Sequence, residues 1–221
     1  MGRELELVAE AMDGGWTAAA GPFSRIAEQL LSDAHDGAAV LLCTSCTGAL
    51  ELAAMTLGIG PGDVVAVPSF TFPSTASAFA RTGARLRFID IDPNTLGMDA
   101  DHLAEQLDHR VKAVVPVHYA GRQASIEAVC AAADRVGAQV VEDNAHGMFG
   151  AHGGKALGTF GSMSTLSFHE TKNFICGEGG ALVIHDPALV ERAEILREKG
   201  TDRSTFFRGE KDKYTWVDIG S

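Results

Sequence analysis

One lysine stands out in the sequence because of its surroundings. Lys172 follows the apolar, strand-like segment STLSFH at 164–169 and precedes the glycine-rich segment GEGGA at 177–181. Burying an ammonium group costs several kcal/mol unless its charge is paired or removed. Either the chain exposes Lys172, or its amine has a chemical task such as forming an imine, which avoids this desolvation cost.

Other polar or aromatic residues also follow apolar segments. Asp143 ends the run VVED, and His146 lies three residues further on. Each residue has an ordinary explanation when it is taken alone: a loop residue, a helix cap or a member of the core. The joint order of the set along one predicted sheet indicates a site. The candidates are Lys172, Asp143, His146, Thr47, Gly48, Ser167 and Phe72.

Three of these residue types match the needs of pyridoxal 5′-phosphate (PLP). Lys172 offers the amine that forms the imine with the cofactor. Asp143 could keep the pyridine nitrogen protonated, so that the ring acts as an electron sink. His146 is close enough in sequence to Asp143 to reach the phenolic oxygen of the same ring.

The other four candidates could hold the phosphate and cover the ring. Thr47 and Gly48 open a predicted helix after a buried strand, where free N–H groups and the helix dipole favour a phosphate. Ser167 could donate its hydroxyl to the same phosphate. Phe72 lies just past a strand end in PSFTFPST and could cover the ring.

The rest of the sequence predicts a sheet that would bring these residues together. Short apolar runs alternate with helical patterns, as in strands buried on both faces of a parallel sheet. We therefore expect an α/β fold, a three-layer α/β/α sandwich with a mostly parallel central sheet, whose ligands gather at the carboxyl ends of the strands. Residues 146–161 predict a hairpin or tight loops, and 200–221 show no recognisable closing element. Expected strands are 39–44, 64–69, 85–91, 111–118, 139–143, 164–169 and 180–186, and expected helices are about 47–57, 74–82, 99–107, 125–136 and 187–198.

Composition excludes several classes of function. The formal net charge of −11 argues against a nucleic-acid or anionic-membrane partner. No apolar run is long enough to span a bilayer, and the first residues lack the layout of a signal peptide, so a cytoplasmic location is expected. Cys43 and Cys46 have C-x-x-C spacing, but no second pair completes a zinc site, which leaves metal or redox use as a minor alternative.

At these residues the sequence resembles the nucleotide-sugar aminotransferases of the DegT/StrS kind, a branch of the fold-type-I PLP enzymes. The likeness runs over nearly the whole chain. Its most specific blocks resemble the subgroup that aminates C4 of TDP-4-keto-6-deoxyglucose. These blocks are SFHETKN, REKGTDRSTFFRG and DKYTWVDIGS, and they accompany TSCTGALELAAM, VPSFTFPSTASAF, VVEDNAHG and GEGGALVI.

The resemblance implies a role for each candidate. Lys172 would bond to PLP and move the proton of transamination, where related dehydratases carry histidine. Asp143 would pair with the pyridine nitrogen, His146 would lie by the phenolic oxygen, and Phe72 would stack on the ring. The amino donor would be glutamate, the product a TDP-4-amino-4,6-dideoxy sugar, and the enzyme a homodimer. The phosphate would be held by Thr47, Gly48 and Ser167.

Relatives of this kind continue well past the motif DIGS. The resemblance therefore implies that residues 1–221 are a PLP-binding large domain truncated at Ser221, with the small C-terminal domain absent. Many relatives place an asparagine, which reaches the neighbouring subunit's phosphate, where this chain has Tyr214, Thr215 and Trp216. Two alternatives stay open. One is an aminotransferase for another keto sugar nucleotide, reacting at C3 or carrying another nucleotide. The other is an inactive fragment that acts only as a binding or assembly module.

Overall fold

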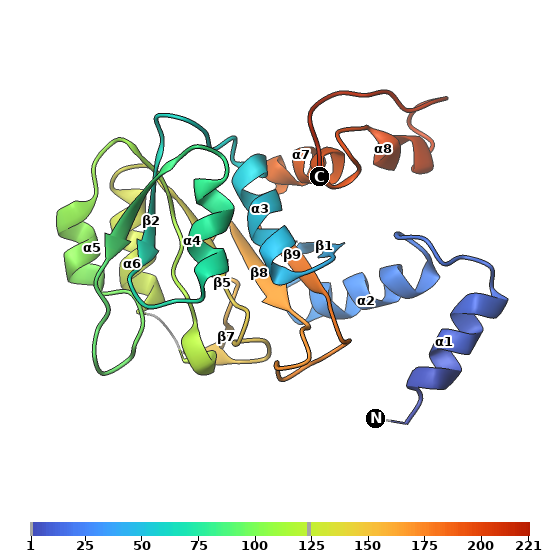
Figure 1. The fold of residues 1–221 in the computed structure, drawn as a ribbon, viewed down its shortest axis with the longest axis horizontal. Coiled ribbons are helices and arrows are strands. Elements are labelled where there is room, and N and C mark those ends of the chain that lie inside the picture. Colours follow the sequence, from blue (N-terminus) through green and yellow to red (C-terminus); the bar gives the residue numbers. More distant parts are fainter. Residues whose placement is uncertain (1, 123–124) are drawn as a thin grey trace.

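A computed structural model of the chain describes residues 2–122 and 125–221 (Figure 1). The strands of its main sheet are β1 (Ala39–Cys43), β2 (Val64–Pro68), β3 (Arg85–Ile89), β4 (Val111–Val114), β5 (Gln139–Asp143), β8 (Met163–Ser167) and β9 (Gly180–Ile184). Within the described residues these seven strands lie in the order β1-β9-β8-β5-β4-β2-β3. Only β9 runs antiparallel to its neighbours β1 and β8. The expected mostly parallel sheet is confirmed.

Helices cover both faces of this sheet (Figure 1). They are α2 (Pro22–Asp33), α3 (Cys46–Thr56), α4 (Pro73–Ala80), α5 (Ala100–Gln106), α6 (Ile126–Asp134) and α7 (Pro187–Arg197). In β2, Val65 and Val67 pack in the core beside α3, α4 and α7, while Val64 and Ala66 pack beside α5 and α6. Since both sets are buried, the unbroken apolar runs are explained by a sheet covered on both faces.

The remaining elements are small or peripheral. The glycine-rich segment forms the expected hairpin, β6 (Ala151–His152) with β7 (Lys155–Ala156). The helix α1 (Glu4–Asp13) buries no residue, and a 3-10 turn covers Tyr119–Gly121. Along the described chain, no helix combines the length and the apolar character needed to cross a membrane.

The last stretch contains a short helix, α8 (Arg203–Phe207), which the sequence did not lead us to expect. The buried side chain of Asp202 organises it. Its carboxylate accepts hydrogen bonds from the backbone N–H of Thr215 at 2.6 Å and from the amine of Lys211. These long-range bonds, rather than local helix propensity, hold the segment in place.

Local sequence sets where the helices next to the site begin. At the start of α3, Ser45 Oγ accepts a hydrogen bond from the Gly48 N–H at 3.0 Å, which caps the helix. At the start of α4, Pro73 occupies the first turn, where its missing N–H costs nothing. Both helices therefore begin directly beyond the carboxyl ends of β1 and β2.

The first residue of β9 shows how closely α3 approaches the sheet. A Cβ atom added at Gly180 would lie 2.4 Å from the backbone of Ser45 and Cys46, so the backbone would have to move. We expect Gly180→Ala to lower the free energy of unfolding by about 1–3 kcal/mol. The control is Gly60→Ala, since no atom lies within 4 Å of that Cβ position. Urea denaturation of both variants measures the difference, and equal midpoints would contradict this account.

Candidate active site

A pocket of about 360 Å³ opens at the carboxyl ends of the parallel strands. It is surrounded by the ends of β5 and β8, the starts of α3 and α4, the segment after β4 and the loop that carries Lys172. Gly48 is not among the lining residues, and its N–H donates to Ser45 Oγ in the cap of α3 rather than pointing to a phosphate position. Six of the seven sequence candidates line the pocket: Lys172, Asp143, His146, Thr47, Ser167 and Phe72.

Lys172 and His146 are in direct contact in this pocket. Lys172 Nζ lies 2.7 Å from His146 Nε2, and the lysine side chain is half-buried. On the other side of the ring, His146 Nδ1 accepts a hydrogen bond from the Ala120 N–H at 3.1 Å. Burial lowers the pKa of His146, and the positive charge of Lys172 lowers it further, although the charge of Asp143 opposes this shift.

The two contacts of His146 determine where hydrogens can lie. Because Nδ1 accepts from the Ala120 N–H, the hydrogen of the neutral ring must be on Nε2. His146 therefore presents Nε2 to the lysine side chain and holds Lys172 Nζ at the pocket, where a lysine amine could form an imine with a bound aldehyde.

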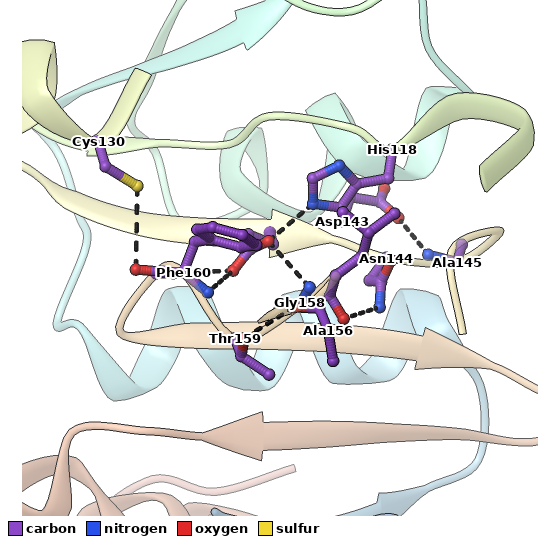
Figure 2. Close-up of polar contacts among 12 residues, drawn as sticks. His118, Cys130, Asp143, Asn144, Ala145, Ala156, Gly158, Thr159 and Phe160 are labelled. Atoms are coloured by element: carbon purple, nitrogen blue, oxygen red, sulfur yellow. Dashed lines mark hydrogen bonds and ion pairs between the residues drawn. The ribbon is translucent and has the colours of Figure 1, made fainter. Parts of the chain in front are cut away.

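Asp143 is buried at the end of β5, with 5% of its surface exposed. Its Oδ2 accepts a hydrogen bond from the Thr75 hydroxyl at 2.7 Å. Its Oδ1 accepts one from the Ala145 N–H at 3.2 Å (Figure 2). Each carboxylate oxygen can accept two hydrogen bonds, so one acceptor position on each remains for a ligand. Sequence reasoning missed Thr75, whose contact with Asp143 joins positions 68 residues apart.

Hydroxyl groups gather at the helix starts. Thr47 Oγ1 lies 2.8 Å from Ser74 Oγ, which joins the first turns of α3 and α4. Ser167, the last residue of β8, is buried and also lines the pocket. With two helix N-termini beside them, these hydroxyls make a suitable seat for an anion. Sequence reasoning missed Ser74, although it stands two residues after the candidate Phe72.

Aromatic side chains form the mouth of the pocket. Phe72 is 68% exposed, so it borders the opening rather than the core. Tyr119 packs against Phe70, with ring centroids 4.8 Å apart, and presents an edge to His146 at 5.1 Å. Tyr119 also lines the pocket and was given no role from the sequence. Its position after a strand end was the available clue.

A buried ion pair holds the end of β5 in place. Glu142 and His118 are fully buried, with Glu142 Oε2 2.7 Å from His118 Nε2. The Glu142 carboxylate also accepts backbone hydrogen bonds from Gly158 at 3.0 Å and from Phe160 and Gly161 at 2.7 Å (Figure 2). Burial by itself would raise the pKa of Glu142, but the hydrogen bond and charge of His118 and the backbone N–H groups outweigh it, so the pKa is lowered.

This ion pair leads to a pH-dependent prediction. Because folding lowers the pKa of Glu142, its stabilising effect is present above the unfolded-state pKa of about 4.3 and is lost as the pH falls through the folded-state value. Glu142→Gln should lower the free energy of unfolding by about 3–5 kcal/mol at pH 7, because the NH₂ group of the glutamine must face groups that are themselves hydrogen-bond donors. The cost should shrink toward pH 3. Denaturation curves at several pH values test this.

The control for that variant is Glu51→Gln, which removes a partly exposed ion pair with Arg81. Its effect should stay below about 1 kcal/mol at every pH. A cost of Glu142→Gln that does not change between pH 7 and pH 3 would contradict the ionised state of Glu142.

Cys43 and Cys46, the C-x-x-C pair, are thiols whose pKa values are raised by burial. Burial raises the pKa of Cys43 to about 11, and burial also raises the pKa of Cys46 strongly. Thiols of this kind are poor nucleophiles and metal ligands near neutral pH. Among the described residues, no three His, Cys, Asp or Glu side chains are arranged to hold a metal ion.

Comparison of the sequence with known proteins finds relatives along almost the whole chain. Residues 2–220 match the model of the DegT/DnrJ/EryC1/StrS aminotransferase family. The chain is 36% identical over 205 residues to the spore coat polysaccharide biosynthesis protein SpsC of Bacillus subtilis, which covers 93% of this chain and 52% of SpsC. The chain thus spans about half the length of the curated relatives it matches.

Solved structures share the fold at similar levels of identity. The aminotransferase TlmJ from Streptoalloteichus hindustanus has a TM-score of 0.90 and 35% identity, covering 100% of this chain and 59% of TlmJ. DesI, solved in the presence of its TDP-sugar product, has a TM-score of 0.84 and 32% identity, covering 89% and 50%. Spr1654 from Streptococcus pneumoniae in its PLP form has a TM-score of 0.89 and 25% identity, covering 100% and 59%.

Proposed function

Because the chain belongs to the DegT/DnrJ/EryC1/StrS aminotransferase family, we propose that it forms the PLP-binding part of an enzyme that transfers an amino group to a keto sugar nucleotide. PLP is the cofactor of this family. The observation that carries the proposal is the 2.7 Å contact of Lys172 Nζ with His146 Nε2, in a pocket that Asp143 also lines.

The donors and acceptors of the pocket fit PLP. The amine of Lys172, which lines the pocket, suits a group that bonds to an aldehyde carbon. The open acceptor positions on Asp143 suit a protonated pyridine nitrogen. The hydroxyls of Thr47, Ser74 and Ser167 lie beside two helix N-termini, and this combination suits a phosphate.

The residues of this chain would divide the proton handling between them. When bound, PLP supplies an electron sink for a C–H bond next to the amino nitrogen of the substrate. Lys172 Nζ would accept and return the proton of that bond, since it lines the pocket and the contact with His146 Nε2 fixes its position. Asp143 would hold a proton at the ring nitrogen, because a buried carboxylate offers a charge-assisted hydrogen bond there.

For the substrates, we propose glutamate as the amino donor and a TDP-4-keto-6-deoxy-hexose as the acceptor, aminated at C4. The supporting observations are the motifs SFHETKN and DKYTWVDIGS and the likeness to DesI, which was solved with a TDP-sugar. We also propose that the protein acts as a homodimer. The exposed side chains of Tyr214 and Trp216, 49% and 76% accessible, support a surface that a second copy would cover.

The cofactor proposal is tested by an absorption spectrum of the chain with added PLP, followed by borohydride reduction and peptide mass mapping. We expect a band at the edge of the visible range and a trapped adduct on Lys172. A folded sample without a band, or an adduct on another lysine, would refute the proposed site. Product analysis with 3-keto and 4-keto sugar nucleotides then tests the substrate.

A further inference from the structure

A chain of two hydroxyl groups runs from the pocket wall to Asp143. Thr71 lines the pocket, and its Oγ1 lies 2.7 Å from Thr75 Oγ1. Thr75 is fully buried in the first turn of α4, and its Oγ1 lies 2.7 Å from Asp143 Oδ2. Thr71 and Thr75 follow β2, whereas Asp143 ends β5, so the contact joins two strand ends that β4 separates in the sheet.

The hydrogens along this chain can point only one way while Asp143 is ionised. A carboxylate has no hydrogen to give, so the single hydroxyl hydrogen of Thr75 must go to Asp143 Oδ2. Thr75 Oγ1 can then only accept from Thr71, whose hydroxyl therefore donates inward. The Ala145 N–H holds the other oxygen, Oδ1. Both oxygens are thus fixed by donors on the protein side.

We infer that Thr75 is a positioning residue for the cofactor, acting through Asp143, an inference that rests on the proposed function. The Thr75 hydroxyl holds the carboxylate in one rotamer and leaves its remaining acceptor positions toward the pocket. A side chain of the same shape without the hydroxyl keeps the packing but leaves a buried carboxylate oxygen without its donor. Such a loss is costly, because hydrogen bonds to charged groups are among the stronger ones in proteins.

The experiment compares Thr75→Val with Thr75→Ser in the 221-residue chain. Valine keeps the volume and removes the hydroxyl, whereas serine keeps the hydroxyl. We expect Thr75→Val to weaken PLP binding about tenfold in an absorbance titration, the order of one hydrogen bond to a charged group. The pH midpoint of the visible band should also rise: a carboxylate that is no longer held toward the ring nitrogen pairs with it less well, and a ring nitrogen with less positive charge repels a proton on the Lys172 nitrogen less. Thr75→Ser should restore both values.

Two further variants separate positioning from folding. Thr56→Val removes another buried hydroxyl, which donates to the Leu52 carbonyl at 2.7 Å outside the pocket, and should leave the pH midpoint unchanged. If Thr75→Val fails to fold, Thr71→Val tests the inference instead. It removes only the hydroxyl that donates to Thr75, so it should shift the pH midpoint in the same direction but by a smaller amount. An unchanged midpoint in the folded variant overturns the inference alone. A wild-type chain without any PLP band overturns the proposed function as well.

Discussion

Replacing Lys172 with alanine is expected to abolish the borohydride-trapped PLP adduct and to slow amino transfer by at least about 10²–10⁴-fold, the usual contribution of a general acid–base group. The variant should fold normally, because Lys172 is half-buried at the pocket and, within the described part of the chain, its side chain hydrogen-bonds only to His146. Mass mapping of the reduced protein and single-turnover spectra with glutamate measure the two effects.

Lys112 provides the matched control for this variant. It is exposed on β4 and does not line the pocket, so Lys112→Ala should leave both the adduct and the rate unchanged. If Lys172→Ala still gave the trapped adduct in full yield, PLP would be bonded to one of the other five lysines.

The fold could be predicted from the sequence because each strand and helix is indicated by residues within its own segment. Strands such as β1, β2 and β9 are short apolar runs that end at a proline or polar residue, although the equally buried β8 contains three hydroxyl residues. The Asp-Pro pair at 186–187 begins α7 as expected, with Asp186 capping the Ala188 N–H at 3.0 Å. The short helix α8 was missed, because the carboxylate of Asp202 stabilises it through contacts with Lys211 and Thr215, which lie beyond the helix.

The residues of the candidate site also fall into those that the sequence indicates and those that it does not. Lys172, Asp143 and His146 could be selected because they follow strands, and the carboxyl ends of parallel strands share one edge of the sheet. Thr75 and the His118–Glu142 pair could not be selected, since their importance comes from partners on other strands. The catalytic and binding roles of the residues in the pocket stay predictions until the variants are measured.

Asp143→Asn separates the charge of this residue from its shape, and it is expected to slow the glutamate half-reaction by about 10²–10³-fold while PLP still binds. The Ala145 N–H cannot turn, so it keeps the amide oxygen beside it. The amide NH₂ then faces Thr75, whose hydroxyl can rotate to accept a hydrogen bond instead of donating one. The fold and the pocket should therefore survive, but no negative charge remains to hold a proton on the pyridine nitrogen.

The rate of conversion of bound PLP to pyridoxamine phosphate, followed by absorbance in a single turnover, measures this loss. Asp99→Asn is the control, because asparagine caps a helix as well as aspartate does and Asp99 caps α5 away from the pocket. Thermal unfolding of both variants should match the wild type within a few degrees. A near-normal rate in Asp143→Asn would mean that the ring nitrogen reacts without its proton, and the role of Asp143 would then be to shape the pocket rather than to supply its charge.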